Sequence, residues 1–131
     1  MSTHASATFE VKHWDEKPFN EIDGGPKLTR VSVSKSFQGD IDGEGTLEYL
    51  MMHRNDGTAD FVGLERVTGR LGDLSGSFVL LHRGTFASGT AKATCVVVAG
   101  SGTGELAGLR GEGFFEAKSR QAPITLDYDI E

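Results

Sequence analysis

Two ionisable side chains interrupt apolar segments in which every second residue shares a face. In DFVGLERV, Glu65 shares its face with Phe61, and in SFVLLH, His82 shares its face with Phe78 and Leu80. Period-two alternation is typical of a half-buried β-strand, so both side chains are expected to point inward. A carboxyl group beside an imidazole in an apolar setting suits acid–base chemistry. Desolvation raises the carboxyl pKa while the imidazolium lowers it, which is expected to leave both groups near the working pH.

The turn between the two segments decides whether these side chains meet. If Asp73-Leu74 is a two-residue loop with Gly72 facing Ser75, Glu65 lies directly opposite His82, with Cβ atoms ~5 Å apart. A one-residue change in the turn would send the two side chains to opposite faces.

A tyrosine joins the candidate site through another hairpin. The turn Asn55-Asp56-Gly57 is typical of a three-residue hairpin loop and places Tyr49 opposite Gly63. The phenol can then donate a hydrogen bond to a developing oxyanion. Glu65, His82 and Tyr49 are therefore the candidate catalytic residues. The alternative is that the Glu–His pair only satisfies its own hydrogen bonds and fixes the strand register, while the tyrosine packs.

Other reactive side chains give weaker signals. If Ser88-Gly89 is a two-residue turn, Cys95 lies beside His82 and permits a Cys–His nucleophile, although a lone cysteine on an apolar strand is usually a small buried hydrophobe. The histidines show no H-x-H or H-x-x-x-H spacing. The sequence therefore predicts no metal and no cofactor.

The segments that position these residues predict an all-β fold. Eight segments alternate with a period of two, and most are joined by hairpin-length turns, which predicts a closed antiparallel meander barrel of about eight strands. Residues 1–6 are small and polar and are expected to form a frayed N-terminus. Residues 15–27 contain two prolines and a Gly-Gly pair and are expected to form a long rim loop.

The glycine-rich stretch GSGTGELAGLRGEGFFE at 100–116 raises the question of a phosphate-binding loop. No segment of helical length follows the glycines, and no lysine stands in the P-loop position. The stretch is therefore interpreted as a looped turn into a strand.

Composition limits the remaining possibilities. The 131 residues fit one domain, 1–131. A net charge of −6 disfavours nucleic-acid binding. No apolar run approaches the ~20 residues that cross a bilayer, so no membrane partner is expected. With a single cysteine and no signal-peptide pattern, the chain is expected to be cytoplasmic.

Long stretches of the chain also resemble a known family. DEKPFNEIDGGPKLTRVSV, DGTADFVGLERVTGRL, GSFVLLHRGTF and GSGTGELAGLRGEG look like the bacterial domain-of-unknown-function family numbered 3224, with a likeness that runs from Phe9 to Glu131. The fold of that family is described as similar to the allene oxide cyclase barrel, and GTGELAGLRG resembles a segment of allene oxide cyclases and dirigent proteins. The resemblance implies a closed eight-stranded barrel with an interior cavity and implies no particular reaction.

Three functions are compatible with such a barrel. The first is a cofactor-free isomerase or cyclase that acts on a small hydrophobic molecule. The second is a lipocalin-like carrier that binds such a molecule without turnover. The residues expected to line the cavity are Trp14, Met51, Phe61, Phe78, Leu80 and Cys95.

The third function is an oligomeric scaffold. Outward apolar residues at Val62, Leu64, Val79 and Leu81 are compatible with an interface between copies. Because the cyclases and dirigent proteins that the chain resembles are commonly trimers, the expected oligomer is a homodimer or homotrimer.

Overall fold

The computed structural model describes residues 2–131 and contains nine β-strands in a single sheet. The strands are β1 (Thr3–Glu21), β2 (Lys27–Gly39), β3 (Ile41–His53), β4 (Ala59–Leu71), β5 (Leu74–Ala87), β6 (Thr90–Val97), β7 (Thr103–Gly104), β8 (Leu109–Ala117) and β9 (Gln121–Ile130). No helix in this part of the chain is long and apolar enough to cross a membrane.

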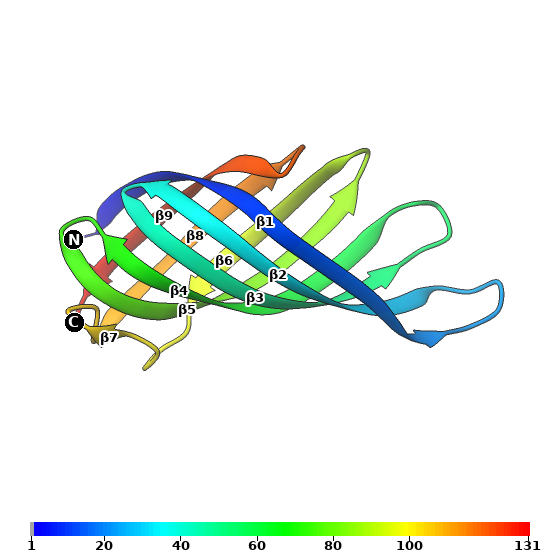
Figure 1. Cartoon of the computed structure of the whole chain (residues 1–131), viewed down its shortest axis with the longest axis horizontal. Helices are drawn as coiled ribbons and strands as arrows, with labels where there is room; N and C mark the ends of the chain where they lie inside the picture. The colour runs from blue at the N-terminus through cyan, green and yellow to red at the C-terminus, as the bar shows by residue number, and fades with distance from the viewer. Residues whose placement is uncertain (1) are drawn as a thin grey trace.

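The sheet closes on itself into a barrel. Eight strands follow the order β4-β3-β2-β1-β9-β8-β6-β5, and β4 pairs with β5 to complete the ring. All of these pairings are antiparallel, and most join strands that are consecutive in the chain (Figure 1). The two-residue β7 lies outside the ring and pairs only with β5. The predicted closed antiparallel meander barrel of eight strands is therefore confirmed.

One end of the barrel is closed by the glycine-rich segment that precedes β8. Leu106 is fully buried in the core, and the turn around it is held by hydrogen bonds from the Leu106 N–H to the Thr103 carbonyl and from the Glu105 N–H to the Ser75 carbonyl. Gly102 lies against the Leu106 carbonyl so closely that a Cβ would overlap it. The segment lies at the same end of the barrel as both chain termini (Figure 1), and Gly102 permits this close packing.

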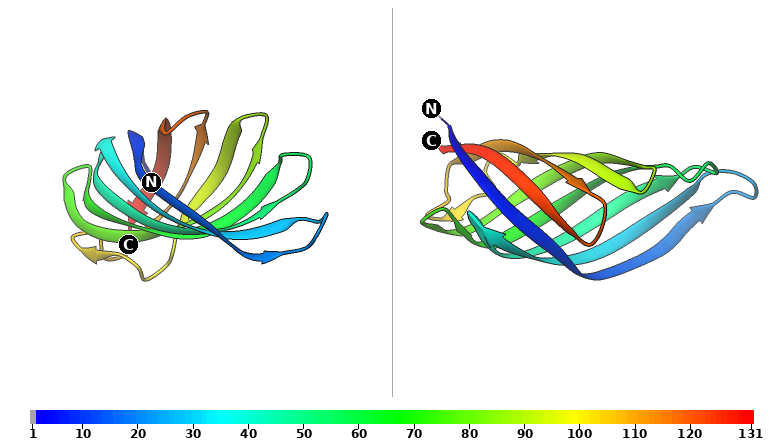
Figure 2. Two further views of the ribbon diagram at one scale, coloured as in Figure 1. Left: turned by 45° about the vertical axis from the view of Figure 1, so that its right-hand side comes forward. Right: turned by 90° about the horizontal axis from the view of Figure 1, so that it is seen from above.

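The predicted rim loop at 15–27 is wrong over most of its length. β1 continues to Glu21 and pairs with β2 up to Lys27, so only residues 22–26 form the connection. Pro18 is tolerated because it lies beyond Glu10, where the pairing of β1 with β9 ends, and beside a register shift between Pro18 and Asn20; sheets accept proline at such edge and bulge positions. The resulting β1–β2 hairpin projects beyond the other hairpins at the open end (Figure 2).

The predicted frayed N-terminus at 1–6 is also wrong for Thr3 onward, while Met1 lies outside the described residues. Thr3 to Glu10 pairs with β9, with Ala5 opposite Leu126. Ala5 is 1% exposed because its small side chain faces the core. Pairing with β9 supplies the backbone hydrogen bonds that hold this segment.

A β-bulge in β1 changes which side chains face the interior. Val11 pairs with Lys35, whereas the next paired residue, His13, faces Ser34. The extra residue shifts the alternation by one. As a result Trp14, rather than His13, continues the face that begins with Phe9 and turns toward the cavity.

The register of β4 against β5 differs from the predicted one by two residues. Leu71 pairs with Leu74, so the loop is Gly72-Asp73 rather than Asp73-Leu74. Gly72 has φ +60°, which glycine adopts readily at the first position of a two-residue hairpin loop. Because the shift is an even number, Glu65 and His82 keep a common face but lie diagonally instead of directly opposite.

Candidate functional site

A chain of buried polar side chains crosses the barrel interior from β3 to β5. His82 Nε2 lies 2.8 Å from Glu65 Oε1, and His82 Nδ1 lies 3.2 Å from the Tyr49 hydroxyl. Glu65 and His82 are 0% exposed and Tyr49 is 5% exposed. The three side chains predicted from alternation therefore meet, through a diagonal rather than a directly opposite Glu–His contact.

Two glycines provide the space that the buried side chains of Tyr49 and Glu65 occupy. Tyr49 lies opposite Gly63, as the hairpin predicts, and a Cβ on Gly63 would meet the tyrosine ring at 2.6 Å. Gly45 gives room to the Glu65 carboxylate, because a Cβ there would overlap Oε2. The glycines let large side chains lie flat against the neighbouring strand, a recurrent arrangement in curved sheets.

Lys35 is the site residue that sequence reasoning missed. Its Nζ lies 3.7 Å from Glu65 Oε1, and its side chain is only 3% exposed. The ammonium also lies 4.2 Å from the centre of the Phe9 ring and 5.2 Å from that of Phe115, within the range of cation–π attraction. The sequence did carry one signal for it: Lys35 lies two residues after Val33, so alternation places both side chains on the inward face of β2.

Two polar atoms of this cluster have no hydrogen-bond partner. Among residues 2–131, the buried side-chain atoms without one are Lys35 Nζ and Glu65 Oε2. An unpaired buried polar group is costly, so each such group in a folded protein calls for an explanation. Both belong to one ion pair, which leaves a donor and an acceptor unused at the same point of the interior.

The Lys35 ammonium decides the charge state of the carboxyl group. Burial alone would raise the pKa of Glu65, but the attraction of Lys35 and the hydrogen bond from His82 together hold that pKa below its ordinary value. Burial lowers the pKa of His82 despite the opposing effect of Glu65. The pair is therefore a carboxylate and a neutral imidazole. The expectation that both titrate near the working pH fails because Lys35 lowers the pKa of Glu65 and burial lowers the pKa of His82.

This charge state assigns the hydrogen-bond directions. Neutral His82 donates from Nε2–H to the Glu65 carboxylate, which leaves Nδ1 as the acceptor for the Tyr49 hydroxyl. Burial raises the pKa of Tyr49 well above its ordinary value, and the Glu65 charge adds to the effect. Tyr49 is thus held as a phenol that donates to the imidazole.

Cys95 lies beside the same imidazole but is not activated by it. Its Sγ is 3.7 Å from His82 Nδ1, because the Ser88-Gly89 turn pairs Cys95 with His82. Burial raises the pKa of the Cys95 thiol to about 12. A nucleophilic cysteine requires the thiolate, so this environment does not support the Cys–His alternative.

An apolar cavity of about 400 Å³ lies above the cluster at the open end of the barrel. Its apolar lining includes Phe9, Trp14, Met51, Phe61, Phe86 and Phe115. Lys35 and Tyr49 also line it, whereas Glu65 and His82 lie beneath them. Of the predicted lining residues, Trp14, Met51 and Phe61 contact the cavity.

The other three predicted lining residues, Phe78, Leu80 and Cys95, lie elsewhere. They do not line the cavity and are 2%, 1% and 0% exposed in the packed part of the core. Inward alternation identified their face correctly but carries no information about depth along the barrel. The cavity occupies only the end where the hairpins diverge.

Polar side chains surround part of the cavity mouth. Glu16 Oε2 lies 2.7 Å from both the Thr29 hydroxyl and His53 Nε2, and Trp14 Nε1 donates to Glu16 Oε1 at 3.1 Å. Burial would raise the pKa of Glu16, but these hydrogen bonds, led by that of Thr29, hold it below its ordinary value. Lys118 and Arg120 lie at the same mouth.

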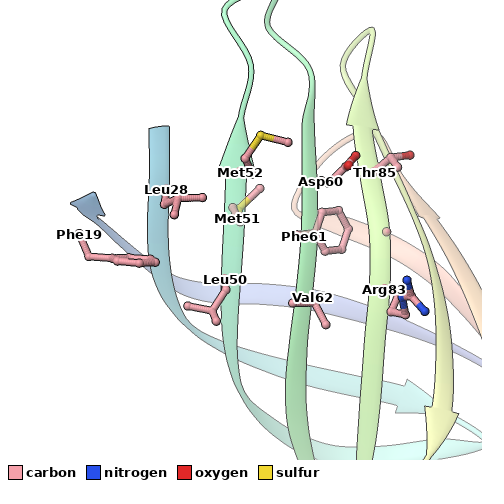
Figure 3. Close-up of a pocket in the computed structure, with 11 residues that line it drawn as sticks. Phe19, Leu28, Leu50, Met51, Met52, Asp60, Phe61, Val62, Arg83 and Thr85 are labelled. Carbon is pink, nitrogen blue, oxygen red and sulfur yellow. The ribbon is translucent and has the colours of Figure 1, made fainter. Parts of the chain in front are cut away.

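A second hollow, of about 560 Å³, lies on the outer wall across β2 to β5. Figure 3 shows its side chains on neighbouring antiparallel strands, with Phe19 reaching over from β1. The hollow adjoins exposed apolar residues, including Leu50, Val62 and Leu64 at 51%, 41% and 54% exposure. None of the buried ionisable groups lines it, so the smaller inner cavity is the candidate chemical site.

Metal ligation has no support in residues 2–131, where no group of three or more His, Cys, Asp and Glu side chains could hold a metal ion. The candidate site is therefore described by its own side chains: a lysine and a tyrosine at the floor of an apolar cavity, backed by a histidine and a glutamate.

The fold and this interior define a small closed β-barrel with one open end. The chain belongs to the family described as protein of unknown function (DUF3224), whose model matches residues 5–128. It is similar to the crystal structure of a DUF3224-family protein of unknown function from Shewanella oneidensis MR-1, with a TM-score of 0.81 and 29% identity over 100% of this chain and 99% of the other. No curated protein shows significant sequence similarity to the chain. The likeness to allene oxide cyclases stays a resemblance of sequence segments.

Proposed function

We propose that the protein binds a small hydrophobic molecule in the inner cavity at the open end of the barrel. The observation that carries the proposal is an apolar cavity of about 400 Å³ whose floor presents Lys35 and Tyr49. Ligand sites are typically apolar concavities of roughly 300–1,000 Å³ with a few placed polar groups. Because the opposite end is closed by Leu106, the ligand enters and leaves between the hairpins.

Filling the cavity should weaken ligand binding. Ala91 lines the cavity, so Ala91→Phe is expected to weaken the binding of N-phenyl-1-naphthylamine by at least about tenfold, as the ring would occupy ligand space. Fluorescence titration measures the affinity. Thr94→Phe is the matched control, because Thr94 lies exposed on the outer face of the same strand. Equal affinity in the Ala91 and Thr94 variants would contradict the assigned cavity.

A second candidate function is proton transfer to or from the bound molecule by a cofactor-free isomerase. The hydrogen-bonded chain from Tyr49 through His82 to Glu65 favours it, because Tyr49 alone of the three contacts the cavity. In this reading Tyr49 exchanges the proton with the substrate, while His82 and Glu65 support it from below.

Deuterium uptake separates turnover from simple binding. A ligand co-purified from the host and incubated with the protein in D₂O should gain deuterium at carbon if proton transfer occurs, and Tyr49→Phe should slow that uptake at least about 100-fold. Mass spectrometry of the ligand measures the uptake. A ligand returned without deuterium would contradict the isomerase reading and leave the binding proposal standing.

We also propose that the outer apolar face of β4 and β5 joins copies of the chain into a homo-oligomer. Val62 and Leu64 are exposed, and Leu64 pairs with the half-buried Leu81. Leu64→Lys is expected to convert the oligomer to monomers in sedimentation velocity, because an interface core excludes unpaired charges. Thr68→Lys, on the same strand face but outside this apolar group, should leave the oligomer intact. A wild-type monomer at micromolar concentration would contradict the proposal.

A further inference from the structure

Lys35 differs from the other lysines of the chain in its surroundings. Lys12, Lys17, Lys27, Lys92 and Lys118 are exposed to solvent. Lys35 is 4% exposed, lines the cavity, and has an amine that makes no hydrogen bond. A lysine held in an apolar pocket is the arrangement in which proteins use the amine as a nucleophile toward carbonyl groups.

We propose that Lys35 is a carbonyl-binding residue and that its amine condenses reversibly with an apolar aldehyde or ketone in the cavity to form an imine. This inference rests on the proposed ligand-binding function and names the class of ligand. Its geometric basis is the buried, unpartnered Nζ of Lys35, a residue that lines the cavity, with the Glu65 carboxylate 3.7 Å away and Tyr49 in the same lining.

Glu65 can carry the protons that the condensation requires. The Lys35 ammonium gives one proton to the carboxylate, and the free amine attacks the carbonyl carbon. The new C–N bond forms as the carbonyl π electrons move to oxygen, which takes the proton back from Glu65. A second proton then passes from nitrogen to the hydroxyl by the same carboxylate. Water leaves as the nitrogen lone pair forms the C=N bond, so ammonium and carbonyl give iminium and water.

The product keeps the electrostatics of the site intact. An iminium carries the same positive charge as the ammonium it replaces, so its attraction to Glu65 and to the ring of Phe9 remains. The proton of the Tyr49 hydroxyl can turn from His82 toward the carbonyl oxygen during attack. Every charged group present before the reaction therefore has a partner after it.

A carboxylate ligand fits the same floor less well. It would place a second anion beside Glu65, which the Lys35 charge already holds in its ionised form. Two carboxylates sharing one buried ammonium repel each other in a low-dielectric site. A neutral carbonyl uses the free donors of Lys35 without adding charge, which favours an aldehyde or ketone.

Reductive trapping tests the inference on the unaltered protein. The probe is 2-naphthaldehyde with sodium cyanoborohydride at neutral pH, followed by peptide mapping. We expect the secondary amine to form on Lys35 at least tenfold faster than on the four exposed lysines that do not line the cavity, which serve as internal controls: Lys12, Lys17, Lys27 and Lys92. Labelling of Lys35 at or below the rate of those four would overturn the inference.

Two further measurements distinguish a failure of this inference from a failure of the proposed function. An excess of 2-methylnaphthalene, which has no carbonyl group, should slow labelling of Lys35 and not of the four control lysines. The Ala91→Phe variant should have the same effect. If N-phenyl-1-naphthylamine binds in the cavity while Lys35 stays unlabelled, the imine is excluded and the binding function stands. If the cavity binds neither probe, the proposed function fails as well.

Discussion

Lys35→Met should destabilise the barrel by about 3–5 kcal/mol at pH 7, because it leaves the Glu65 carboxylate buried with its opposite charge removed. The deficit relative to wild type should shrink as the pH falls toward 4. In the wild type, the lowered pKa of Glu65 contributes stability that is present above the unfolded value and is lost as the pH falls through the folded value. In the variant the carboxyl group is expected to take up a proton more readily. Guanidinium unfolding between pH 4 and 7 measures both effects.

The double variant Lys35→Met/Glu65→Gln identifies the cause of this loss. Removing both charges should restore most of the stability, since replacing both members of a buried ion pair is often nearly neutral. Lys92→Met is the matched control, because its ion pair with Glu116 is exposed and contributes little. A deficit in Lys35→Met that is unchanged by pH and by the Glu65 substitution would show that lost packing, rather than charge, is responsible.

The second large effect is expected in alkaline solution. Burial raises the pKa of the Cys95 thiol from near 9 to about 12. The stability that the protonated thiol contributes is fully present below the unfolded pKa and is lost as the pH rises toward the folded pKa. Linkage sets the loss at about 1.4 kcal/mol per pH unit over this interval, or about 4 kcal/mol in total. The raised pKa of Tyr49 adds to the loss at higher pH.

Comparing Cys95→Ala with wild type isolates the contribution of the thiol. The variant should be less stable at pH 7 because it leaves a small cavity, yet its unfolding free energy should fall less steeply between pH 9 and 11. Guanidinium unfolding followed by circular dichroism provides the slopes. Parallel slopes would mean that Cys95 ionises as readily in the folded barrel as in the unfolded chain, in conflict with its 0% exposure.

The strands and their inward faces could be predicted from the sequence because alternation reports directly on burial. Tyr49 opposite Gly63 and Cys95 opposite His82 followed from hairpins whose turn residues were recognisable. The β4–β5 register was wrong because Gly72 and Asp73, rather than Asp73 and Leu74, form the loop. Glycine suits position 72 both as the first residue of the loop and as the last residue before it, so composition alone does not choose between the two registers.

The remaining differences come from features that alternation cannot show. The bulge after Val11 exchanges the faces of His13 and Trp14 without any change in composition. The segment at 15–21 has the composition of a loop, but pairing with β2 holds it as a strand. Lys35 occupies an inward position that its type disfavours, and its partner Glu65 becomes apparent only in three dimensions.

The pairing of β1 with β9 sets the order in which this chain can finish folding. Thr3 to Glu10 finds its partner at Gln121 to Tyr128, more than a hundred residues later. During synthesis, β1 and β8 therefore present unpaired edges until β9 leaves the ribosome, and such edges can template association between nascent chains. Pairing β1 with β9 also closes the longest loop in the fold, so this step carries the largest loss of conformational entropy. We therefore expect slow refolding, limited by the joining of the two ends, which would make the first strand the last to be secured.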